Sequence, residues 1–302
     1  MSFAKPAKTA PTMFHYTNAA GLVGIIRNRE LWATGSNYLN DPTEVSFAAT
    51  ALAAALRERL DEANEDRDRA QVALDLLERA YVDPHSPDQY REDRSFITSF
   101  SRSDQSLTLW RLYGGRNGFC IGFDEDHLLR WTNSPEFPTG ERDGLAADER
   151  EELDALRANF QLSARIEDVS YGGQDVAPIL DEVMAVPYDP QQPYAHEWRL
   201  REAMNQLSRI KHPAYEDEKE ARLIVQEVHH HAANPSVRVS AAGALVAYRR
   251  IVFPFEAVQS ITMAPGANTP QQHRALKALM AQGGRGPYSH VEVRECGLPF
   301  VW

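Results

Sequence analysis

Two carboxylates and a guanidinium have the types and spacing best suited to chemistry in this chain. Glu218, Glu220 and Arg222 stand at every second position, and alternate residues of an extended segment point to one side. The apolar run 223–225 that follows is typical of a buried strand, where carboxylates need a partner or a purpose. An exposed ion ladder is the alternative, and the pattern leaves both open.

A second polar group, His15-Tyr16-Thr17, ends a short aromatic segment near the start of the chain. In a strand, His15 and Thr17 share one face, where they could hold the edge of a sugar by hydrogen bonds. An isolated histidine at a strand end is more often a core residue with its hydrogen bonds satisfied. The polar neighbours favour a binding role here.

Trp110 and Tyr113 form a third group, at the i, i+3 spacing that predicts one face of a helix. Such a pair is usually part of a core. Arg111 and the glycines at 114 and 115 adjoin it, which suits a flat aromatic ligand about as well.

The fourth group is Asn40-Asp41-Pro42, with Glu44 just after it. Asn or Asp before Pro commonly starts a turn or a helix by local hydrogen bonding, and the helix dipole favours an acid in the first turn. A structural turn is therefore the stronger interpretation, with Asn40 and Asp41 kept as candidates for a binding site.

These groups need elements to position them, and hydrophobic periodicity predicts those elements. Asn18 is a suitable N-cap for a helix that carries residues 22–26. The same periodicity predicts the other elements. Strands are expected at 13–17, 31–34, 96–101, 119–123, 166–171, 220–225, 251–253 and 257–263, and near 291. Helices are expected at 44–82, 106–110 and 151–164, within 174–210, and at 271–282.

The alternation of strands with inserted helices favours an α+β fold, a single domain built on a split or strongly curved mixed sheet. Residues 1–12, with two prolines, predict a flexible leader ahead of one domain at 13–302. Cys120 and Cys296 are expected to be reduced thiols.

Composition limits the kinds of partner. The formal net charge of -11 argues against general duplex binding, although the Arg-rich stretch 91–116 leaves a local basic groove open. Since no apolar run approaches the length of a membrane span and the start lacks a signal peptide's apolar stretch, we expect a soluble, cytoplasmic protein.

No metal is expected either. The run His229-His230-His231 has no Cys, Asp or Glu partner at a recognisable ligand spacing. The glycines at 114, 115 and 118 lack the sequence context of a phosphate loop or a dinucleotide fingerprint.

The polar groups, in this order, resemble DUF2971, a widespread family of mostly bacterial proteins of unknown function. The resemblance runs from about residue 14 to 226. Its pieces are Phe14-His15-Tyr16-Thr17, Leu31-Trp32, Leu39-Asn40-Asp41-Pro42-Thr43-Glu44, Phe100-Ser101, Trp110-Arg111-Leu112-Tyr113, Gly118-Phe119-Cys120-Ile121-Gly122-Phe123, Val169-Ser170-Tyr171 and Glu218-Lys219-Glu220-Ala221-Arg222.

A weaker resemblance links the His-Tyr-Thr strand and the late strand carboxylates to ADP-ribosyltransferases. That resemblance implies an ADP-ribosyltransferase-like fold and NAD as the substrate. It also implies that His15 holds the NAD ribose. Glu220 or Glu218 would bind the ribose hydroxyl and stabilise the cation formed as nicotinamide leaves.

The resemblance therefore implies an NAD-dependent ADP-ribosyltransferase or NAD glycohydrolase, with a bacterial toxin or defence effector as one role for it. Its acceptor, a protein or a nucleic acid, is unknown. The alternative is a non-catalytic module that binds a nucleotide or a protein in the same cleft. Glu220 and Glu218 are the expected catalytic residues, and the expected NAD-binding residues are His15, Tyr16, Thr17, Asn40, Asp41, Trp110, Tyr113 and Arg222.

Overall fold

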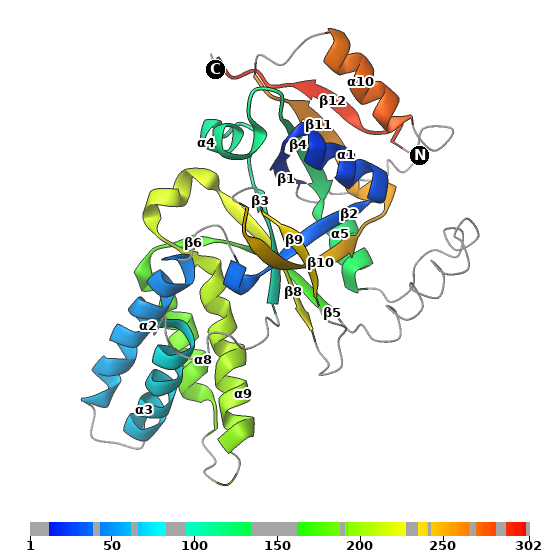
Figure 1. Cartoon of the computed structure of the whole chain (residues 1–302). Coiled ribbons are helices and arrows are strands. Elements are labelled where there is room, and N and C mark those ends of the chain that lie inside the picture. Colours follow the sequence, from blue (N-terminus) through cyan, green and yellow to red (C-terminus); the bar gives the residue numbers. More distant parts are fainter. Residues whose placement is uncertain are drawn as a thin grey trace, which may run out of the picture.

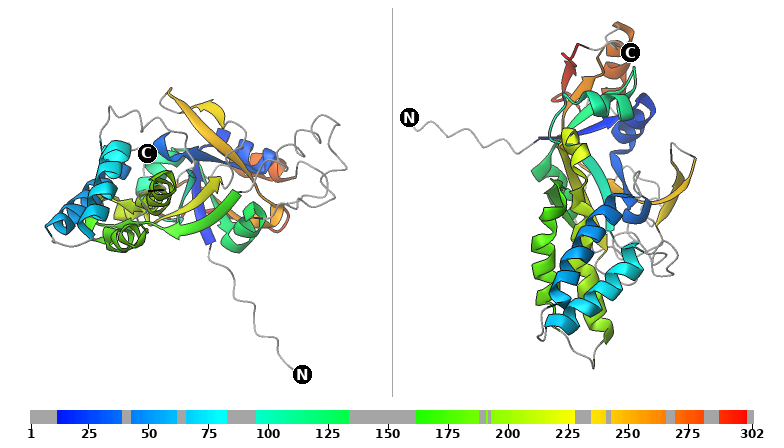
Figure 2. Two further views of the ribbon diagram at one scale, coloured as in Figure 1. Left: turned by 90° about the horizontal axis from the view of Figure 1, so that it is seen from below. Right: turned by 90° about the vertical axis from the view of Figure 1, so that its left-hand side faces the viewer.

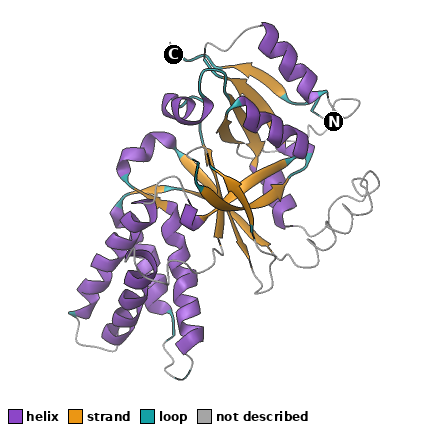
Figure 3. Ribbon diagram, in the orientation of Figure 1, coloured by secondary structure: helices purple, strands orange, loops and turns teal. Residues whose placement is uncertain are grey.

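A mixed sheet crosses the molecule, and a bundle of helices extends from one end of it (Figure 1). Two further views, and the colouring by secondary structure, show the bundle standing beside the sheet (Figures 2 and 3). The structure is a computed structural model, and it describes residues 12–38, 43–61, 66–82, 95–133, 162–187, 191, 193–227, 235–240, 243–265, 270–281 and 288–299.

Ten strands form the main sheet in the described part of the chain. They are β1 (Thr12–Thr17), β2 (Glu30–Gly35), β3 (Ser95–Ser101), β4 (Phe119–Asp124), β5 (Leu162–Asp168), β8 (Glu220–Glu227), β9 (Ser236–Val239), β10 (Leu245–Val252), β11 (Val258–Met263) and β12 (Glu292–Glu295). The order β12-β11-β4-β1-β3-β2-β10-β9 forms the main path, and β8 and β5 lie on the other side of β3. Only β11 and β12 pair in parallel among these strands, so the sheet is mixed, as predicted.

Strand β3 joins two parts of this sheet. One edge pairs with β8 from Ser95 to Ser101. The opposite edge pairs with β2 at Phe96 and Ile97 and with β1 at Ser101 alone. Within the described part of the chain, residues 98–100 therefore have no strand partner on that edge, and pairing between β1 and β3 is reduced to Phe14 with Ser101. The sheet is thus interrupted between β1 and β3.

The main core lies against one face of the sheet, under α1 (Ala19–Asn28), α5 (Glu125–Asn133) and α10 (Pro270–Met280). Leu22 of α1, Leu128 of α5 and Leu276 of α10 pack there on strand residues such as Ile121. Helix α1 begins where predicted, because the Asn18 side chain accepts a hydrogen bond from the backbone N–H of Gly21.

The bundle has a separate apolar core. It comprises α2 (Thr43–Leu60), α3 (Asp66–Leu77), α8 (Ala177–Ala185) and α9 (Pro193–Met204), with a π-helical turn (Glu78–Val82) after α3. Small residues on one side of α2, among them Ala49 and Ala53, are fully or almost fully buried and allow the helices to approach closely.

Short elements connect the bundle to the sheet. They are the two-stranded parallel ladder β6 (Ser170–Tyr171) with β7 (Ile210–Lys211), and the 3-10 turns Ser36–Tyr38, Gly173–Val176, Asn205–Arg209 and Pro213–Glu218. A further 3-10 turn, Phe255–Ala257, joins β10 to β11 within the sheet. Helix α4 (Leu107–Leu109) continues into a π-helical turn (Trp110–Gly114).

Most predicted elements are confirmed, and two predictions are wrong. Residues 162–164 were predicted to end a helix but begin a strand, because β5 starts at Leu162 and pairs with β8 along its whole length. The single strand predicted at 166–171 is two strands, β5 and β6, in different sheets. The strand predicted at 251–253 is confirmed at 251 and 252 as the end of β10, which begins at Leu245. Helix α5 and strand β9 were not predicted.

Several predictions fall on residues that the structure does not describe. They are the flexible leader, of which residues 1–11 are not described, and the turn Asn40-Asp41-Pro42. Thr12, the last residue of the predicted leader, is already part of β1. Within the described residues, no helix is both long and apolar enough to cross a membrane.

Candidate functional site

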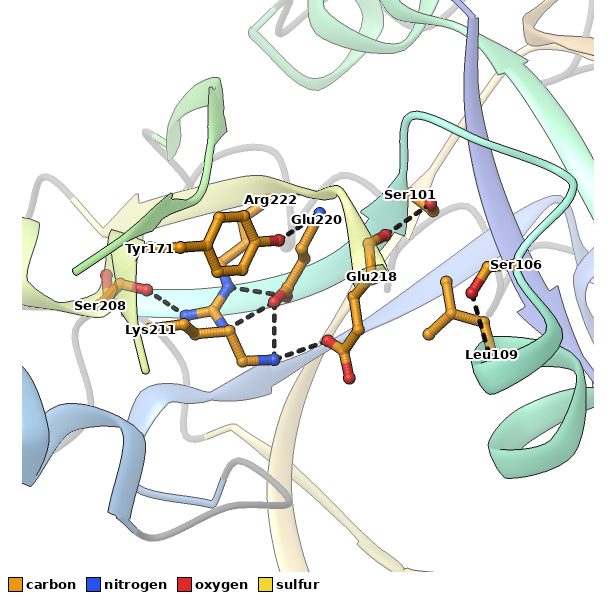
Figure 4. A network of polar contacts seen from close by, with 9 residues as sticks. All are labelled: Ser101, Ser106, Leu109, Tyr171, Ser208, Lys211, Glu218, Glu220 and Arg222. Carbon is orange, nitrogen blue, oxygen red and sulfur yellow. Dashed lines mark hydrogen bonds and ion pairs between the residues drawn. The ribbon is translucent and has the colours of Figure 1, made fainter. Parts of the chain in front are cut away.

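Four charged side chains meet at the start of β8, where the bundle joins the sheet (Figure 4). Arg222 Nε lies 2.7 Å from Glu220 Oε1, and Arg222 Nη2 lies 3.0 Å from Glu220 Oε2. Lys211 Nζ lies 2.8 Å from Glu218 Oε2 and 2.9 Å from Glu220 Oε2. We call Lys211, Glu218, Glu220 and Arg222 the charged quartet.

The quartet draws its members from three elements. Lys211 is on β7, Glu218 ends the 3-10 turn 213–218, and Glu220 and Arg222 alternate on β8. The expectation that Glu218 continues the row of Glu220 and Arg222 in one strand is wrong. Lys219 has a left-handed backbone with a φ of 45°, so the chain turns there and β8 begins only at Glu220.

All four side chains are buried, which also excludes the exposed ion ladder. Arg222 is 1% exposed, and the other three are between 5% and 7% exposed. Two positive and two negative charges balance, the condition under which charges tolerate burial. Burial alone would raise the pKa of the Glu220 carboxyl, but the charge and hydrogen bonds of Arg222, with Lys211, outweigh it and lower that pKa below its ordinary value.

Neighbouring groups fix the quartet in place. Arg222 Nη1 donates to the backbone oxygen of Ser208, and the Tyr171 hydroxyl accepts a hydrogen bond from the Glu220 backbone N–H at 2.7 Å. The Ser101 hydroxyl donates to the Glu218 backbone oxygen at 2.7 Å, which ties the turn 213–218 to the end of β3.

The two carboxylates differ in what remains available for a ligand. Both oxygens of Glu220 contact cations of the quartet. Glu218 uses Oε2 for Lys211, and Oε1 has no hydrogen-bond partner among the residues that the structure describes. Chemistry that needs an unoccupied carboxylate oxygen therefore has Glu218 as its candidate.

His15 lies on β1 beside the interruption of the sheet. Its Nδ1 is 3.0 Å from the backbone oxygen of Ser99, in the stretch of β3 that has no strand partner on that side. Its ring meets Phe100 edge-on at 5.7 Å. Burial lowers the pKa of the His15 imidazole, and the hydrogen bond to Ser99 only partly offsets this. Thr17 shares the face of His15, as expected for alternate strand residues.

Strand register determines how His15 relates to the quartet. Directly paired residues share a face, so Phe14 and Tyr16 lie on the face of Ser101 and Glu220. His15 therefore points to the other face, and the structure brings it to β3 without direct contact with the quartet. A ligand that touched both would have to lie across the interruption between β1 and β3.

The aromatic pair does not share one environment. Trp110 is fully buried and meets Tyr16 edge-on at 5.0 Å, with its indole N–H donating to the Asp104 backbone oxygen. Tyr113 is 43% exposed. The π-helical turn places i and i+3 on different sides, which explains the departure from the α-helical expectation. Trp110 has no exposed surface for a ligand, whereas Tyr113 has.

Tyr16 has a structural role in the same region. Its hydroxyl donates to the Ser103 backbone oxygen at 2.8 Å and accepts from the Ser106 backbone N–H at 3.1 Å. These bonds hold the loop between β3 and α4 against β1, and burial raises the pKa of the hydroxyl.

One member of the quartet was not predicted, because Lys211 precedes a proline-containing turn and no pattern marks it. Ser101 and Tyr171, which hold the quartet in place, were not predicted as site residues either. Both were among the pieces of the DUF2971 resemblance, which was the available signal. Asn40, Asp41 and the histidine run 229–231 lie outside the described residues, and within the described part no three His, Cys, Asp or Glu side chains gather to hold a metal.

Comparison with known proteins finds a family model that matches part of the chain. The model, described as "Protein of unknown function (DUF2971)", matches residues 109–223, a segment that contains Trp110, Tyr113 and the quartet. No curated protein and no solved structure matches the chain. The match supports the predicted DUF2971 resemblance over residues 109–223, and the earlier pieces, from Phe14 to Ser101, lie outside it.

Proposed function

We propose that this protein acts on NAD, as an ADP-ribosyltransferase or an NAD glycohydrolase, at the junction of β1, β3 and β8. One observation carries the proposal. His15 and Glu218, far apart in sequence, are tied to Ser99 and Ser101, which are about 7 Å apart along one strand. That separation is well within the length of a dinucleotide.

The proposal assigns a role to each group. His15, with a lowered pKa, is neutral near pH 7, so its imidazole can exchange hydrogen bonds with a ribose hydroxyl. Glu218 offers the carboxylate oxygen, Oε1, that has no hydrogen-bond partner among the described residues. Glu220 is held by Arg222 and Lys211 and contributes a fixed negative charge beside it.

The reaction would break the bond between ribose C1′ and the nicotinamide nitrogen. The bonding electrons leave with nicotinamide, which becomes neutral, and the ribose becomes an oxocarbenium-like cation that a carboxylate stabilises. Water or an acceptor nucleophile then attacks C1′, and its proton passes to a carboxylate or to solvent. The acceptor decides between hydrolysis and transfer.

A second candidate function is a non-catalytic module that binds a nucleotide or a protein. The engagement of both Glu220 oxygens favours it, because a buried and fully paired carboxylate is also what a structural ion cluster requires. In that case the quartet joins the bundle to the sheet and performs no chemistry.

Incubation with NAD labelled on the adenylate separates these functions. Release of nicotinamide, or transfer of label to a lysate component, supports the enzyme. Saturable NAD binding by equilibrium dialysis without release supports the binding module. If the protein neither binds NAD nor releases nicotinamide from it, the proposal that it acts on NAD is wrong.

A further inference from the structure

An exposed aromatic and cationic surface lies on β2, β10 and β9, away from the quartet. Trp32 is 46% exposed, although it is in the middle of a strand. The Tyr248 ring lies 4.8 Å from it, tilted by 40°, and the Arg238 guanidinium carbon lies 5.8 Å from the Trp32 ring centre. We call Trp32, Tyr248, Arg238 and Arg250 the Trp32 platform.

Strand pairing determines which side of the sheet the platform residues face. Tyr248 pairs with Thr34, and the exposed Arg250 pairs with Trp32, so Trp32, Tyr248 and Arg250 face the same side of the sheet. Arg238 Nη2 reaches across β10 to donate to Thr34 Oγ1 at 3.0 Å.

A hydrogen bond also holds the Trp32 ring itself. The indole N–H donates to Glu30 Oε1 at 3.0 Å. This bond orients the ring and uses one oxygen of the acid nearest to it. The surface therefore presents a half-exposed ring with the Arg238 guanidinium beside it, and the exposed Arg250 is the strand partner of Trp32 on β10.

We propose that the Trp32 platform binds single-stranded nucleic acid, with one base on the Trp32 ring and phosphates at Arg238 and Arg250. An exposed aromatic ring stacks on any base that is not paired, and arginine beside it matches the strand's negative backbone. Duplex bases are already stacked and present no face to the ring, so the proposal agrees with the acidic net charge, which argues against general duplex binding.

The platform lies on the same face of the sheet as the candidate site. Thr34 pairs with Ile97 of β3, and alternate residues along β3 pair with Arg222 and Glu220. Trp32 therefore faces the same side of the sheet as the quartet, with β3 between them. This inference goes beyond the proposed function, and binding can be measured without NAD.

The test is anisotropy of a labelled 12-nucleotide oligo(dT) or oligo(U) titrated with the full chain at low salt. Wild type should bind, and a duplex of equal length should bind more weakly. Trp32→Ala should weaken binding by about tenfold, the scale of one lost stacked base, and Trp32→Tyr should retain most of it. Arg250→Gln should reduce the salt slope by about 0.7.

Trp198→Ala is the matched control, because Trp198 is 49% exposed on α9 and belongs to no such cluster of described aromatic and arginine residues. Circular dichroism of every variant confirms folding. The proposal is overturned if wild type does not bind the oligonucleotide, or if folded Trp32→Ala binds as tightly as Trp198→Ala. Complete displacement by millimolar NAD would also overturn it, because the platform would then be a site for the free nucleotide.

Discussion

Arg222 and Glu220 form a bidentate ion pair, and the two residues are separated by one residue on the buried strand β8. The Nε–Oε1 distance is 2.7 Å and the Nη2–Oε2 distance is 3.0 Å. Because the pair is almost completely shielded from water, removing either charge takes a two-bonded contact away from a charge that stays buried in a medium of low polarity. This relationship makes Glu220 a stabilising residue, whatever chemistry takes place beside it.

Glu220→Gln should therefore destabilise the protein. Arg222 and Lys211 would both lose the carboxylate that contacts them, and breaking a buried pair costs about 3–5 kcal/mol. Urea unfolding at pH 7 measures the loss. Glu292→Gln is the control, because Glu292 forms an exposed pair with Arg294, and its unfolding curve should match wild type. Equal stability of the two variants would show that the quartet does not hold β8 in place.

The pH dependence of stability should carry a contribution from His15. Burial lowers the folded-state pKa of His15. Below pH about 6.5, His15 therefore becomes protonated in the unfolded chain while it stays neutral in the folded chain. Stability from this group is complete above pH about 6.5 and is lost as pH falls toward the folded pKa. The free energy of unfolding of wild type should fall more steeply from pH 7.5 to 5 than that of His15→Asn. Parallel curves would mean that His15 titrates alike in both states.

Two glycines should respond in opposite ways to alanine. A Cβ at Gly118 would lie 2.1 Å from the backbone oxygen of Gly114, and backbone cannot move aside cheaply, so Gly118→Ala should cost about 1–3 kcal/mol. A Cβ at Gly24 would have no heavy atom within 4 Å, and alanine in a helix interior should add up to about 1 kcal/mol. Thermal melting of both variants checks the signs. A stable Gly118→Ala would mean that the turn before β4 can rearrange.

Local patterns were enough to predict most elements of the sheet. The alternation of residues 96–101 and 220–225 predicted the paired strands β3 and β8, and Asn18 predicted the start of α1. The start of β5 was missed because polar residues alternate on its outer face, where Arg165 and Glu167 pair with each other and resemble a charged helix in the sequence.

The candidate site was predictable only in part. The types of Glu218, Glu220 and Arg222 marked the region, but their geometry depends on the left-handed backbone at Lys219, a residue type that rarely adopts it. Lys211 joins the quartet through a parallel ladder between β6 and β7 that is too short to leave a periodic pattern. The burial of Trp110 follows from a π-helical turn, which the i, i+3 spacing did not predict.

Nicotinamide release by purified Glu218→Gln tests the central claim most directly. The substitution keeps the shape of the side chain and removes the charge next to the unoccupied oxygen, so turnover of NAD should fall by about 10² or more. Asp217→Asn is the matched control, because Asp217 is the exposed neighbouring carboxylate and should turn over NAD like wild type. The account predicts release by wild type and Asp217→Asn and its near-loss in folded Glu218→Gln. It is contradicted if wild type releases no nicotinamide, or if Glu218→Gln releases it at the wild-type rate.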